Sequence, residues 1–441
     1  MNPSPLVHVL IINWNGLEHL QDCFESLLSS PYSNAKFILL DNATDDDSVA
    51  YVREHFGNDP RVDFRLLDEN LGWSRANNEG MKAALDAGAD YVLLLNNDTR
   101  VEPDFLDKLV EHAESDPEIG ALSPRILMFD DSQIINSVGL EASIIGSGWD
   151  RGIGRIDSLE WDSNEAILGV CGAAMFLRTS ALQESGLLPD DFEIYLDDLD
   201  LCLRIWNSGY TIKLCYASVV HHKFSATMGE GKRARHKYYL NTRNRSRIVL
   251  RNFPSNQLLR ALLTIDFAEA KAVGRAILDG DLWKIPLHLR SWIDFFLYIP
   301  KAISHRRTHH PRTASQDLIR NRPLFFPGVV FPENGWYPPI DIDGAEYRPM
   351  AKTAEYEHTG GKLRIRIANP HKNVAHTEIS ITHSDDTIAT LDDEKFSHAE
   401  FDVLAGTITF RANAIISAEQ SGLLHDVGGW ISIETDSGNI A

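Results

Sequence analysis

The first hundred residues repeat one pattern four times, and this repetition constrains the fold more than any other feature of the chain. A short strand-like stretch ends in Asn, Asp or Gly, and a helical pattern follows it. The four stretches are residues 7–12, 37–40, 62–67 and 91–95. Alternating strands and helices of this length predict an α/β fold with a mostly parallel, doubly wound sheet. Ligands of such sheets bind just past the carboxyl ends of the strands.

The polar residues that follow these stretches are candidate contacts for a bound nucleotide. Each turn taken singly is also what ordinary turn chemistry requires. Together, however, the turns would line one edge of the sheet. The candidates are Asn13, Asn15, Asp41, Asn42, Asn70, Gly72, Arg75, Asn78, Asn96 and Asn97.

Asp98 follows shortly after the apolar stretch at residues 91–95. Its carboxylate is a hard oxygen donor of the type that Mg²⁺ or Mn²⁺ uses when a diphosphate supplies further ligands. The alternative is a strand-to-helix turn that caps the helix expected near Pro103. We therefore expect a divalent metal with Asp98 as a ligand, and the capping role stays open.

Two further groups lie downstream. Asp197, Asp198 and Asp200 form the one dense carboxylate cluster that precedes a clear helical pattern. Acids in the first turn of a helix also favour its macrodipole, so a capping role is the alternative. His222 ends an apolar strand, where a neutral imidazole could reach a metal. The preceding His221 is a rival, and a surface hydrogen bond is the ordinary fate of such histidines.

Seven segments, in this order and spacing, resemble those of the family 2 inverting glycosyltransferases, and most closely their rhamnosyltransferase-like branch. The resemblance covers roughly residues 5 to 250. The segments are Ile11-Ile12-Asn13-Trp14-Asn15-Gly16, Leu40-Asp41-Asn42-Ala43-Thr44-Asp45, Asn70-Leu71-Gly72 with Asn77-Asn78, Leu95-Asn96-Asn97-Asp98, Gly172 to Arg178, Phe192 to Cys202, and Val219 to Lys223.

The resemblance implies a GT-A-type nucleotide-sugar-binding domain, a divalent metal, and a single displacement that inverts the anomeric carbon. By this resemblance Asp198 matches the catalytic base, and Asp197 stands where the family has a glutamate. Likewise Asp41 would read the pyrimidine base, His222 would bind the metal or the diphosphate, and Arg243 would contact donor or acceptor phosphates. Asn96 replaces the first carboxylate of the usual Asp-X-Asp metal motif, a variant that also occurs in the rhamnosyltransferase-like branch.

The expected function is transfer of a sugar from a nucleotide-sugar donor to a hydroxyl of a glycan or lipid-linked acceptor in bacterial cell-surface polysaccharide synthesis. The resemblance points to dTDP-rhamnose as the donor, with a UDP-sugar as the alternative. A nucleotidyltransferase would be expected to carry a glycine-rich, lysine-bearing loop after its first strand, unlike residues 13–16. A non-catalytic sugar-binding protein need not keep Asp98 together with Asp198.

Composition narrows the setting. The net charge of −21 argues against nucleic-acid binding. The four cysteines form no CxxC pair and lie in apolar segments, which indicates buried thiols in a reducing compartment. The start of the chain lacks the basic residues and cleavage site of a signal peptide, and no apolar run is as long as a membrane span. We therefore expect a cytoplasmic protein.

We expect four parts: a catalytic domain at 1–255, a helical extension at 256–310, a proline-rich linker at 311–339 and a small all-β accessory domain at 340–441. The aromatic-rich stretch 283–299 leads into basic residues. It can pack on the catalytic domain or lie on a membrane, so peripheral contact with the inner face of the cell membrane stays open. Period-two alternation after residue 340 predicts an antiparallel β-sandwich. Its role could be acceptor or partner binding, or purely structural.

Overall fold

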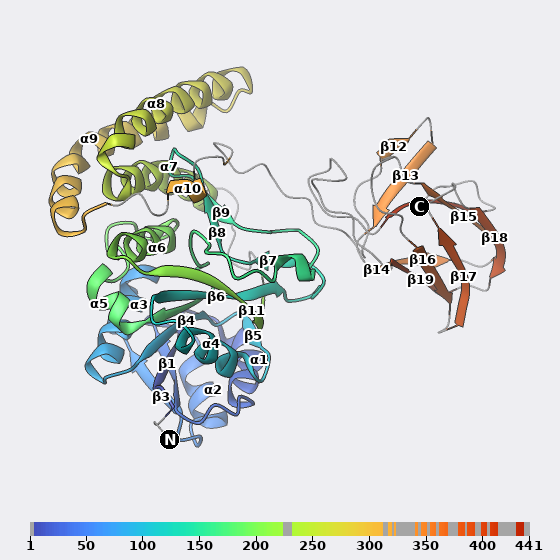
Figure 1. The fold of residues 1–441 in the computed structure, drawn as a ribbon, viewed down its shortest axis with the longest axis horizontal. Coiled ribbons are helices and arrows are strands. Elements are labelled where there is room, and N and C mark those ends of the chain that lie inside the picture. Colours follow the sequence, from blue (N-terminus) through green and yellow to red (C-terminus); the bar gives the residue numbers. More distant parts are fainter. Residues whose placement is uncertain are drawn as a thin grey trace. The chain divides into compact units, whose positions relative to one another are not determined.

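The computed structural model describes residues 4–223, 232–311, 316–319 and 322, together with nine strands between residues 340 and 435 (Figure 1). The chain divides into two compact units. The first comprises residues 1–130, 136–152 and 160–326, and the second comprises residues 131–135, 153–159 and 327–441. The predicted proline-rich linker, 311–339, lies almost entirely outside the described residues.

A nine-stranded sheet forms the centre of the first unit. Its strand order is β3-β2-β1-β4-β10-β6-β11-β5, and β7 pairs with β6. Neighbours β3, β2, β1 and β4 run parallel, as do β6 and β11, whereas β10 and β5 are antiparallel to their partners. The strands are β1 (Val7–Asn13), β2 (Ala35–Asp41), β3 (Val62–Leu66), β4 (Tyr91–Asn96), β5 (Thr99–Val101), β6 (Ile119–Met128), β7 (Ile135–Ser137), β10 (Ala174–Arg178) and β11 (Thr211–His222). The predicted mostly parallel α/β sheet is confirmed.

Helices on both faces bury the sheet, which explains why its central strands are continuously apolar. The helices of this part are α1 (Leu17–Leu28), α2 (Ser48–His55), α3 (Trp73–Asp86) and α4 (Phe105–Glu114). Val9 and Ile11 of β1 share a core with Phe24 of α1. On the other face, a Cβ at Gly80 of α3 would lie 2.7 Å from Leu10 Cδ1. The missing side chain therefore lets α3 approach the sheet closely.

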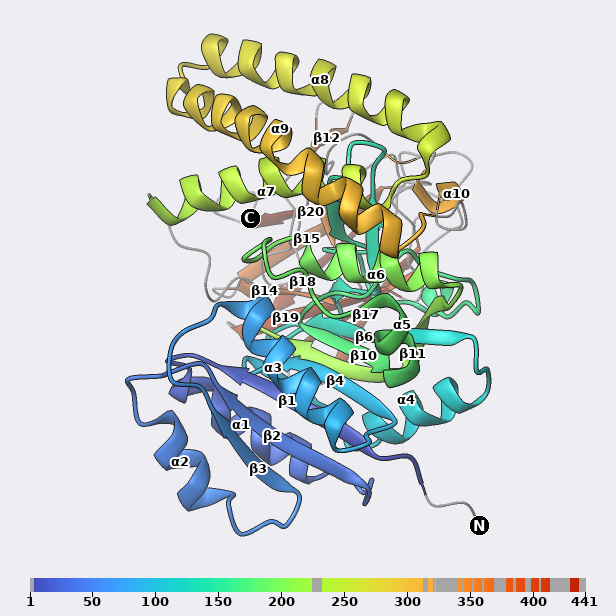
Figure 2. The same ribbon diagram turned by 90° about the vertical axis from the view of Figure 1, so that its left-hand side faces the viewer.

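The remaining helices of the first unit cover the end of the sheet that includes β6 and β11. They are α5 (Thr179–Ser185), α6 (Asp197–Ser208), α7 (Lys232–Asn252), α8 (Ser255–Leu278), α9 (Ile285–Thr308) and α10 (Gln316–Ile319), with short 3₁₀ turns at Leu159–Trp161 and Leu282–Lys284. A two-stranded hairpin joins β8 (Leu140–Ala142) to β9 (Gly148–Asp150). Figure 2 shows α8 and α9 side by side as an outer layer over α7, and α6 lies between α7 and the sheet. None of the described helices is long and apolar enough to cross a membrane.

The second unit contains two antiparallel sheets. One has the order β12-β13-β20-β15-β18 and the other β14-β19-β16-β17. Alternate apolar residues from both sheets, among them Ile365, Ile381 and Phe410, form one buried core, as period-two strands in a sandwich require. The predicted antiparallel β domain is confirmed. Its strands are β12 (Ile340–Ile342), β13 (Ala345–Met350), β14 (Thr353–His358), β15 (Gly361–Ala368), β16 (Glu378–His383), β17 (Asp386–Asp392), β18 (His398–Val403), β19 (Gly406–Ala412) and β20 (Gly429–Thr435).

Candidate functional site

The carboxyl ends of three neighbouring parallel strands bring the predicted polar residues together. Asn13 at the end of β1 pairs in register with Asp41 at the end of β2. On the other side of β1, Ile12 pairs with Asn96 at the end of β4. Because these residues lie at one level of the sheet, their side chains share the edge at which an α/β fold binds ligands.

Asn13, Asp41 and Asn97 form a hydrogen-bonded row along this edge. Asn13 Nδ2 donates to Asp41 Oδ1 at 3.3 Å, and Asn97 Nδ2 donates to Asn13 Oδ1 at 2.7 Å. The backbone N–H of Thr44 donates to the other oxygen of Asp41 at 3.2 Å. A Cβ at Gly16 would lie 2.0 Å from Asn97 Nδ2, so only glycine leaves room for this row. The Asp41 carboxylate is thus held at a fixed position with acceptor capacity remaining.

The loops that leave β2 and β3 are tied together by their own amides. Asn42 Nδ2 donates to Asn70 Oδ1 at 2.9 Å, and the Leu71 N–H donates to Asn42 Oδ1 at 2.8 Å. Gly72, at a φ of 77°, donates its N–H to Asn70 Oδ1 at 2.9 Å. Arg75 is exposed, with its Nε bound to the Leu71 carbonyl. Arg75 lies in the first turn of α3, and donor binding by its exposed side chain stays a prediction.

Asn15 performs the same task between the turns that follow β1 and β2. Its side-chain oxygen accepts from Thr44 Oγ1 at 2.7 Å and from the Asp45 N–H at 2.9 Å. Asn15 has a φ of 50°, a left-handed conformation that asparagine tolerates better than most residues. These bonds shape the turn beside Asp41, and donor binding by Asn15 stays a prediction.

Asp98 and His222 lie together, as predicted for a metal site. Asp98 Oδ1 is 3.3 Å from His222 Nε2 and has no hydrogen-bond partner among the described residues. His222 Nδ1 lies 2.7 Å from Asn136 Oδ1, so Nε2 is the ring nitrogen that faces the carboxylate. A lone pair on Nε2 opposite a carboxylate oxygen fits a divalent cation between them.

The described residues contain no group of three or more His, Cys, Asp and Glu side chains that could hold a metal ion. A cation at this position would therefore take only two protein ligands, Asp98 and His222. Water and substrate oxygens would complete its coordination, as is common for Mg²⁺. His221, the predicted rival, places its Nε2 atom 2.8 Å from Glu102 Oε1. This hydrogen bond favours the ordinary structural role for His221.

Asp198 stands in the first turn of α6, partly exposed, against a surface that Gly172 and Trp73 provide. Its two oxygens accept the N–H groups of Gly172 at 3.1 Å and Leu199 at 2.7 Å. A Cβ at Gly172 would lie 3.2 Å from the Trp73 ring and 3.5 Å from Asp198 Oδ2. Trp73 Nε1 in turn donates to Asn96 Oδ1 at 3.3 Å. Trp73 thus lies beside both Asn96, at the end of β4, and Gly172, whose N–H binds Asp198.

The neighbouring aspartates have different contacts. Asp197 is buried, and one of its oxygens accepts a hydrogen bond from Ser74 Oγ at 2.5 Å. Asp200 is fully buried, 2.9 Å from both Arg204 and Arg251. Arg251 and Arg204 hold the pKa of Asp200 down to about 2, although burial acts in the opposite direction. Among the three, only Asp198 offers a carboxylate to an approaching substrate.

Electrostatics also suit Asp198 to proton transfer. Burial raises its pKa, and the nearby carboxylates of Asp197 and Asp150 raise it further, whereas the hydrogen bonds from Leu199 and Gly172 lower it. Burial likewise raises the pKa of Asp197, and the Ser74 hydrogen bond opposes this. A carboxylate whose pKa is raised is a stronger base than an ordinary aspartate.

Asp150, at the end of β9, is a further candidate site residue, and the sequence pattern does not reveal it. Its pKa is raised by burial, although hydrogen bonds with Cys171 and Ser137 and the nearby His222 oppose the shift. Its Oδ1 atom has no hydrogen-bond partner in the described part of the chain. Asp150 therefore interacts electrostatically with both His222 and Asp198. No sequence signal marks it, because it lies in a short hairpin far from both in the chain.

The loop that directly precedes α6 and its aspartates has a strained backbone. Glu193, Tyr195 and Leu196 have φ values of 69°, 70° and 64°, a left-handed region that costs non-glycine residues of order 1–3 kcal/mol each. The Leu196 conformation immediately precedes α6, so it sets the direction in which the helix and Asp198 begin. Backbone strain of this kind persists only where the surroundings enforce it.

Two neighbouring residues of α7 enforce it here. Asn244 is fully buried, and its Nδ2 lies 3.0, 3.2 and 2.9 Å from the carbonyl oxygens of Phe192, Ile194 and Tyr195. Arg243 Nη2 donates to the Phe192 carbonyl at 2.8 Å, and Nη1 lies 2.9 Å from Glu193 Oε1. The sequence predicts a phosphate contact for Arg243, and Asn244 is not among the predicted site residues. The contacts indicate positioning of the loop by both, and donor binding by Arg243 stays a prediction.

Asn78 also points away from the strand-end edge. Its Nδ2 donates to Asp190 Oδ1 at 2.7 Å and to the Leu188 carbonyl at 2.9 Å, and its Oδ1 accepts the Leu188 N–H at 3.0 Å. These bonds join α3 to the segment before the strained loop. Its predicted contact with the donor is untested, and the bonds support a role in positioning.

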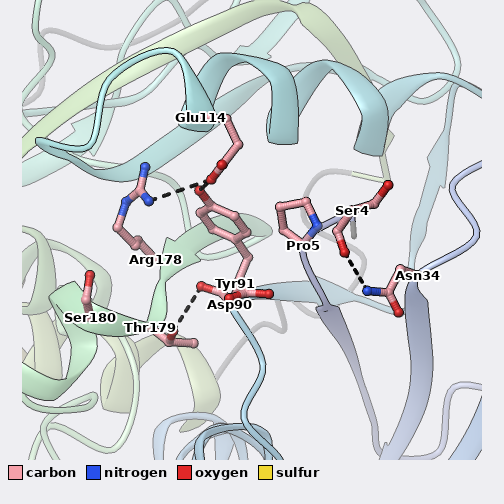
Figure 3. A pocket seen from close by; sticks show the side chains of 9 residues that line it. All are labelled: Ser4, Pro5, Asn34, Asp90, Tyr91, Glu114, Arg178, Thr179 and Ser180. Carbon is pink, nitrogen blue, oxygen red and sulfur yellow. Dashed lines mark hydrogen bonds and ion pairs between the residues drawn. The ribbon is translucent and has the colours of Figure 1, made fainter. Parts of the chain in front are cut away.

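A cavity of about 630 Å³ lies elsewhere on the first unit (Figure 3). Its lining includes residues that begin or precede the parallel strands, namely Pro5, Asn34 and Tyr91, together with Glu114 at the end of α4 and Arg178 at the end of β10. Tyr91 and Arg178 point toward Glu114, which accepts a hydrogen bond from the Tyr91 hydroxyl (Figure 3). Since this cavity lies at the amino ends of the strands, it is separate from the edge that carries Asp41, Asp98 and Asn13.

Part of the chain matches a known protein family. Residues 8–184 match the sequence profile described as Glycosyl transferase family 2. This domain belongs to glycosyl transferase family 2. The matched residues include the strand-end edge, the Asp98 position and Gly172, whereas α6 and its aspartates lie after the matched region.

Two curated relatives each match about half of this chain. The N-acetylglucosaminyl-diphospho-decaprenol L-rhamnosyltransferase of Mycobacterium tuberculosis is 25% identical over 245 residues, which span 51% of this chain and 78% of the relative. The poly-beta-1,6-N-acetyl-D-glucosamine synthase of Staphylococcus epidermidis is 26% identical over 211 residues. That match spans 47% of this chain and 47% of the synthase, about half the length of each.

Among solved structures, S. aureus TarS 1–349 shares 14% sequence identity and a TM-score of 0.45 with this chain. The match covers 78% of this chain and 96% of TarS 1–349. A TM-score of this size supports no inference about function.

Proposed function

We propose that the protein is an inverting glycosyltransferase that moves a hexose from a nucleoside-diphosphate sugar to a hydroxyl of a glycan or lipid-linked acceptor. The observation that carries this proposal is the position of Asp198. Asp198 is a partly exposed carboxylate, and burial raises its pKa. It accepts the N–H of Gly172, which lies beside Trp73. Trp73 in turn donates to Asn96 at the strand-end edge of a family 2 domain. The chemistry of such a transfer needs one base on the acceptor side and a nucleotide site on the other.

The strand-end row would hold the nucleotide. Asp41 keeps acceptor capacity after its bonds to Asn13 and Thr44. It can accept the N–H that a thymine or uracil base offers. The amide-linked loops around Asn42 and Asn70 would frame the same nucleoside. Hydrogen bonds already hold these side chains in place, so binding a nucleotide would cost little conformational entropy. This pre-organisation supports the assignment.

Asp98 and His222 would hold a divalent cation, Mg²⁺ or Mn²⁺, beside the donor diphosphate. When bound, such a cation supplies positive charge that stabilises the departing diphosphate. Asn136 fixes the His222 ring so that Nε2 faces the site. Asn96 stands in place of a second carboxylate and carries no charge. Its side-chain oxygen accepts a hydrogen bond from the Trp73 N–H.

Asp198 would act on the acceptor. Its carboxylate takes the proton of the acceptor hydroxyl as that oxygen forms its bond to the anomeric carbon. The bond from that carbon to the diphosphate oxygen breaks on the opposite face, and the electron pair leaves with the nucleoside diphosphate. One displacement of this kind inverts the anomeric configuration. Gly172 and Leu199 orient the carboxylate through their N–H groups.

For the donor we propose dTDP-rhamnose, with a UDP-sugar as the alternative. The mycobacterial relative is named an L-rhamnosyltransferase that acts on an N-acetylglucosaminyl-diphospho-decaprenol, which supports rhamnose and a lipid-linked acceptor. The staphylococcal relative is named a synthase of poly-N-acetyl-D-glucosamine, which supports the alternative. Both fit bacterial cell-surface polysaccharide synthesis in the cytoplasm, at the inner face of the membrane.

A donor panel tests the function. The protein is incubated with dTDP-rhamnose and a set of UDP- and GDP-sugars in the presence of Mn²⁺, and released nucleoside diphosphate is measured. We expect release from one class of donor, faster when a lipid-linked diphosphate glycan is added. Failure to bind or cleave any nucleotide sugar, with folded protein shown by circular dichroism, would overturn the proposal.

A further inference from the structure

The outer helices α8 and α9 carry an unusual amount of exposed apolar surface. Twelve of the sixteen large hydrophobic side chains that are exposed in the described part of the chain lie between residues 259 and 303. Several are mostly in solvent: Phe267 is 68% exposed, Phe296 67% and Leu297 74%. Scattered exposed hydrophobics need no explanation, but a contiguous group marks an interaction site.

The spacing places these residues on one side of each helix. On α8, Leu259, Leu263 and Phe267 follow each other at intervals of four residues, and Leu289, Ile293 and Leu297 do so on α9. Residues four apart lie on the same helix face. We call this group of six the apolar face.

The opposite sides of both helices pack against other elements of the first unit. Tyr298 and Ala302 of α9 are buried against Leu250 of α7. On α8, buried Glu269 forms an ion pair with Arg245 of α7 and accepts a hydrogen bond from His288 of α9. The two helices lie side by side in the outer layer of this unit (Figure 2). The apolar face therefore points away from the unit it is anchored to.

The charge of this region is opposite to that of the rest of the chain. Residues 255–308, which span α8 and α9, contain 8 Lys and Arg against 5 Asp and Glu, a net charge of +3. Since the whole chain has −21, the remaining residues carry −24. An apolar face amid basic residues is complementary to an anionic lipid surface.

We propose that the apolar face of α8 and α9 docks on an anionic lipid membrane, with the helices lying in the plane of its surface. Each helix has 24 residues and is about 36 Å long, so the two provide a broad contact. The charge disfavours a second copy of this chain as the occupant, because two basic regions would meet. The reason given for this docking rests on the proposed function, whereas the docking itself is argued from the apolar face and its charge.

The structure also connects these helices to the base. A cavity of about 340 Å³ is lined by Ala272 of α8, His288 of α9, and Tyr238 and Arg245 of α7. Leu196, which begins the turn into Asp197 and Asp198, lines the same cavity. Docking through α8 and α9 would therefore hold the base-bearing loop near the membrane, where the sugar of a lipid-linked acceptor lies.

Vesicle flotation with the whole chain tests the proposal. The vesicles contain phosphatidylcholine alone or with about one third phosphatidylglycerol. We expect flotation only with the anionic vesicles, and its loss in high salt. The quadruple variant Leu263→Gln, Phe267→Gln, Ile293→Gln, Leu297→Gln should lower the partition coefficient by about tenfold or more, because binding scales with buried apolar area. These side chains are at least 61% exposed, so the fold should tolerate the change.

The matched control is Leu66→Gln with Leu159→Gln, two hydrophobics of 50% and 79% exposure outside these helices. It should float like the wild type. Equal flotation of the quadruple variant and the wild type would overturn the proposal, as would no flotation of the wild type. Loss of a dimer in the quadruple variant, measured by light scattering, together with no vesicle binding, would assign the face to a second copy instead. Nucleoside diphosphate release without vesicles is measured in parallel and reports separately on the proposed function.

Discussion

At the scale of single residues, two adjacent aspartates differ in what they can do. Asp197 is buried with a hydrogen bond to Ser74, whereas Asp198 is partly exposed beside Gly172. We predict that Asp198→Asn lowers the rate of sugar transfer by about 10²–10⁴-fold, the usual range for a lost acid–base group. Donor affinity, measured by calorimetry, should stay within the error of the wild type. Asp197→Asn, assayed in parallel, should keep far more activity, and the reverse ranking would make Asp197 the base.

Asp150 should tune this base from a distance. Because its negative charge raises the pKa of Asp198, Asp150→Asn should lower that pKa. If Asp198 is the base, its protonation lowers the rate of transfer, so the acid limb of the pH profile of kcat/KM should move to lower pH in the variant. An unchanged or upward-shifted limb would show that Asp150 does not act on the titrating group.

Asp98 allows a test of the metal that does not depend on turnover. We predict that Asp98→Ala weakens Mn²⁺ binding in the presence of a nucleoside diphosphate, measured by calorimetry, by at least about tenfold, in line with the loss of one of two protein ligands. The fold should persist, because this side chain is partly exposed at the strand end. Transfer by the wild type in excess chelator would remove the metal from the mechanism.

At the scale of elements, the loop before α6 depends on α7. Removing the Asn244 amide leaves the carbonyls of Phe192, Ile194 and Tyr195 without their donor. We predict that Asn244→Ala lowers the transfer rate by about 10²-fold, as a misplacement of about 1 Å can, with nucleotide affinity unchanged. Asn256→Ala, at an exposed position of α8, is the control. A fall in nucleotide affinity equal to the fall in rate would argue for general loosening instead.

Elements with a clear local sequence pattern were the predictable part of this protein. Strands such as Val7–Asn13 and Tyr91–Asn96 are apolar runs that end in polar residues, so local pattern marks both the strand and its ligand edge. Asp150, Trp73 and Asn244 were not recognised as site residues, because their importance arises from contacts across the fold. Asn78 illustrates the opposite case. It lies in the right segment, but its amide turns to Leu188 and Asp190.

At the scale of the whole molecule, two units with separate buried cores should unfold as separate transitions in calorimetry.

Asp200→Ala would leave the buried Arg204 and Arg251 without the carboxylate that pairs with them. We predict that it lowers the free energy of unfolding of the first unit by about 3–5 kcal/mol, the range for a broken buried pair. The transition of the second unit should not move, and a shift of both would show that they unfold together.

The same residue sets an acid limit for the first unit. The pKa of Asp200 is about 2 in the folded protein and about 3.9 in an unfolded chain. A depressed pKa contributes stability above the unfolded value, and this stability is lost as the pH falls toward 2. The wild-type transition of this unit should therefore weaken across that interval more steeply than the transition of Asp200→Ala.

The left-handed backbone at Glu193, Tyr195 and Leu196 has a consequence for engineering. Glycine accepts this conformation freely, so a search for thermostable variants would select glycine at these positions. The same replacements would free the backbone to leave the geometry that aims Asp198. Heat resistance and catalytic rate should therefore compete at this loop, and variants selected for one should be screened for the other.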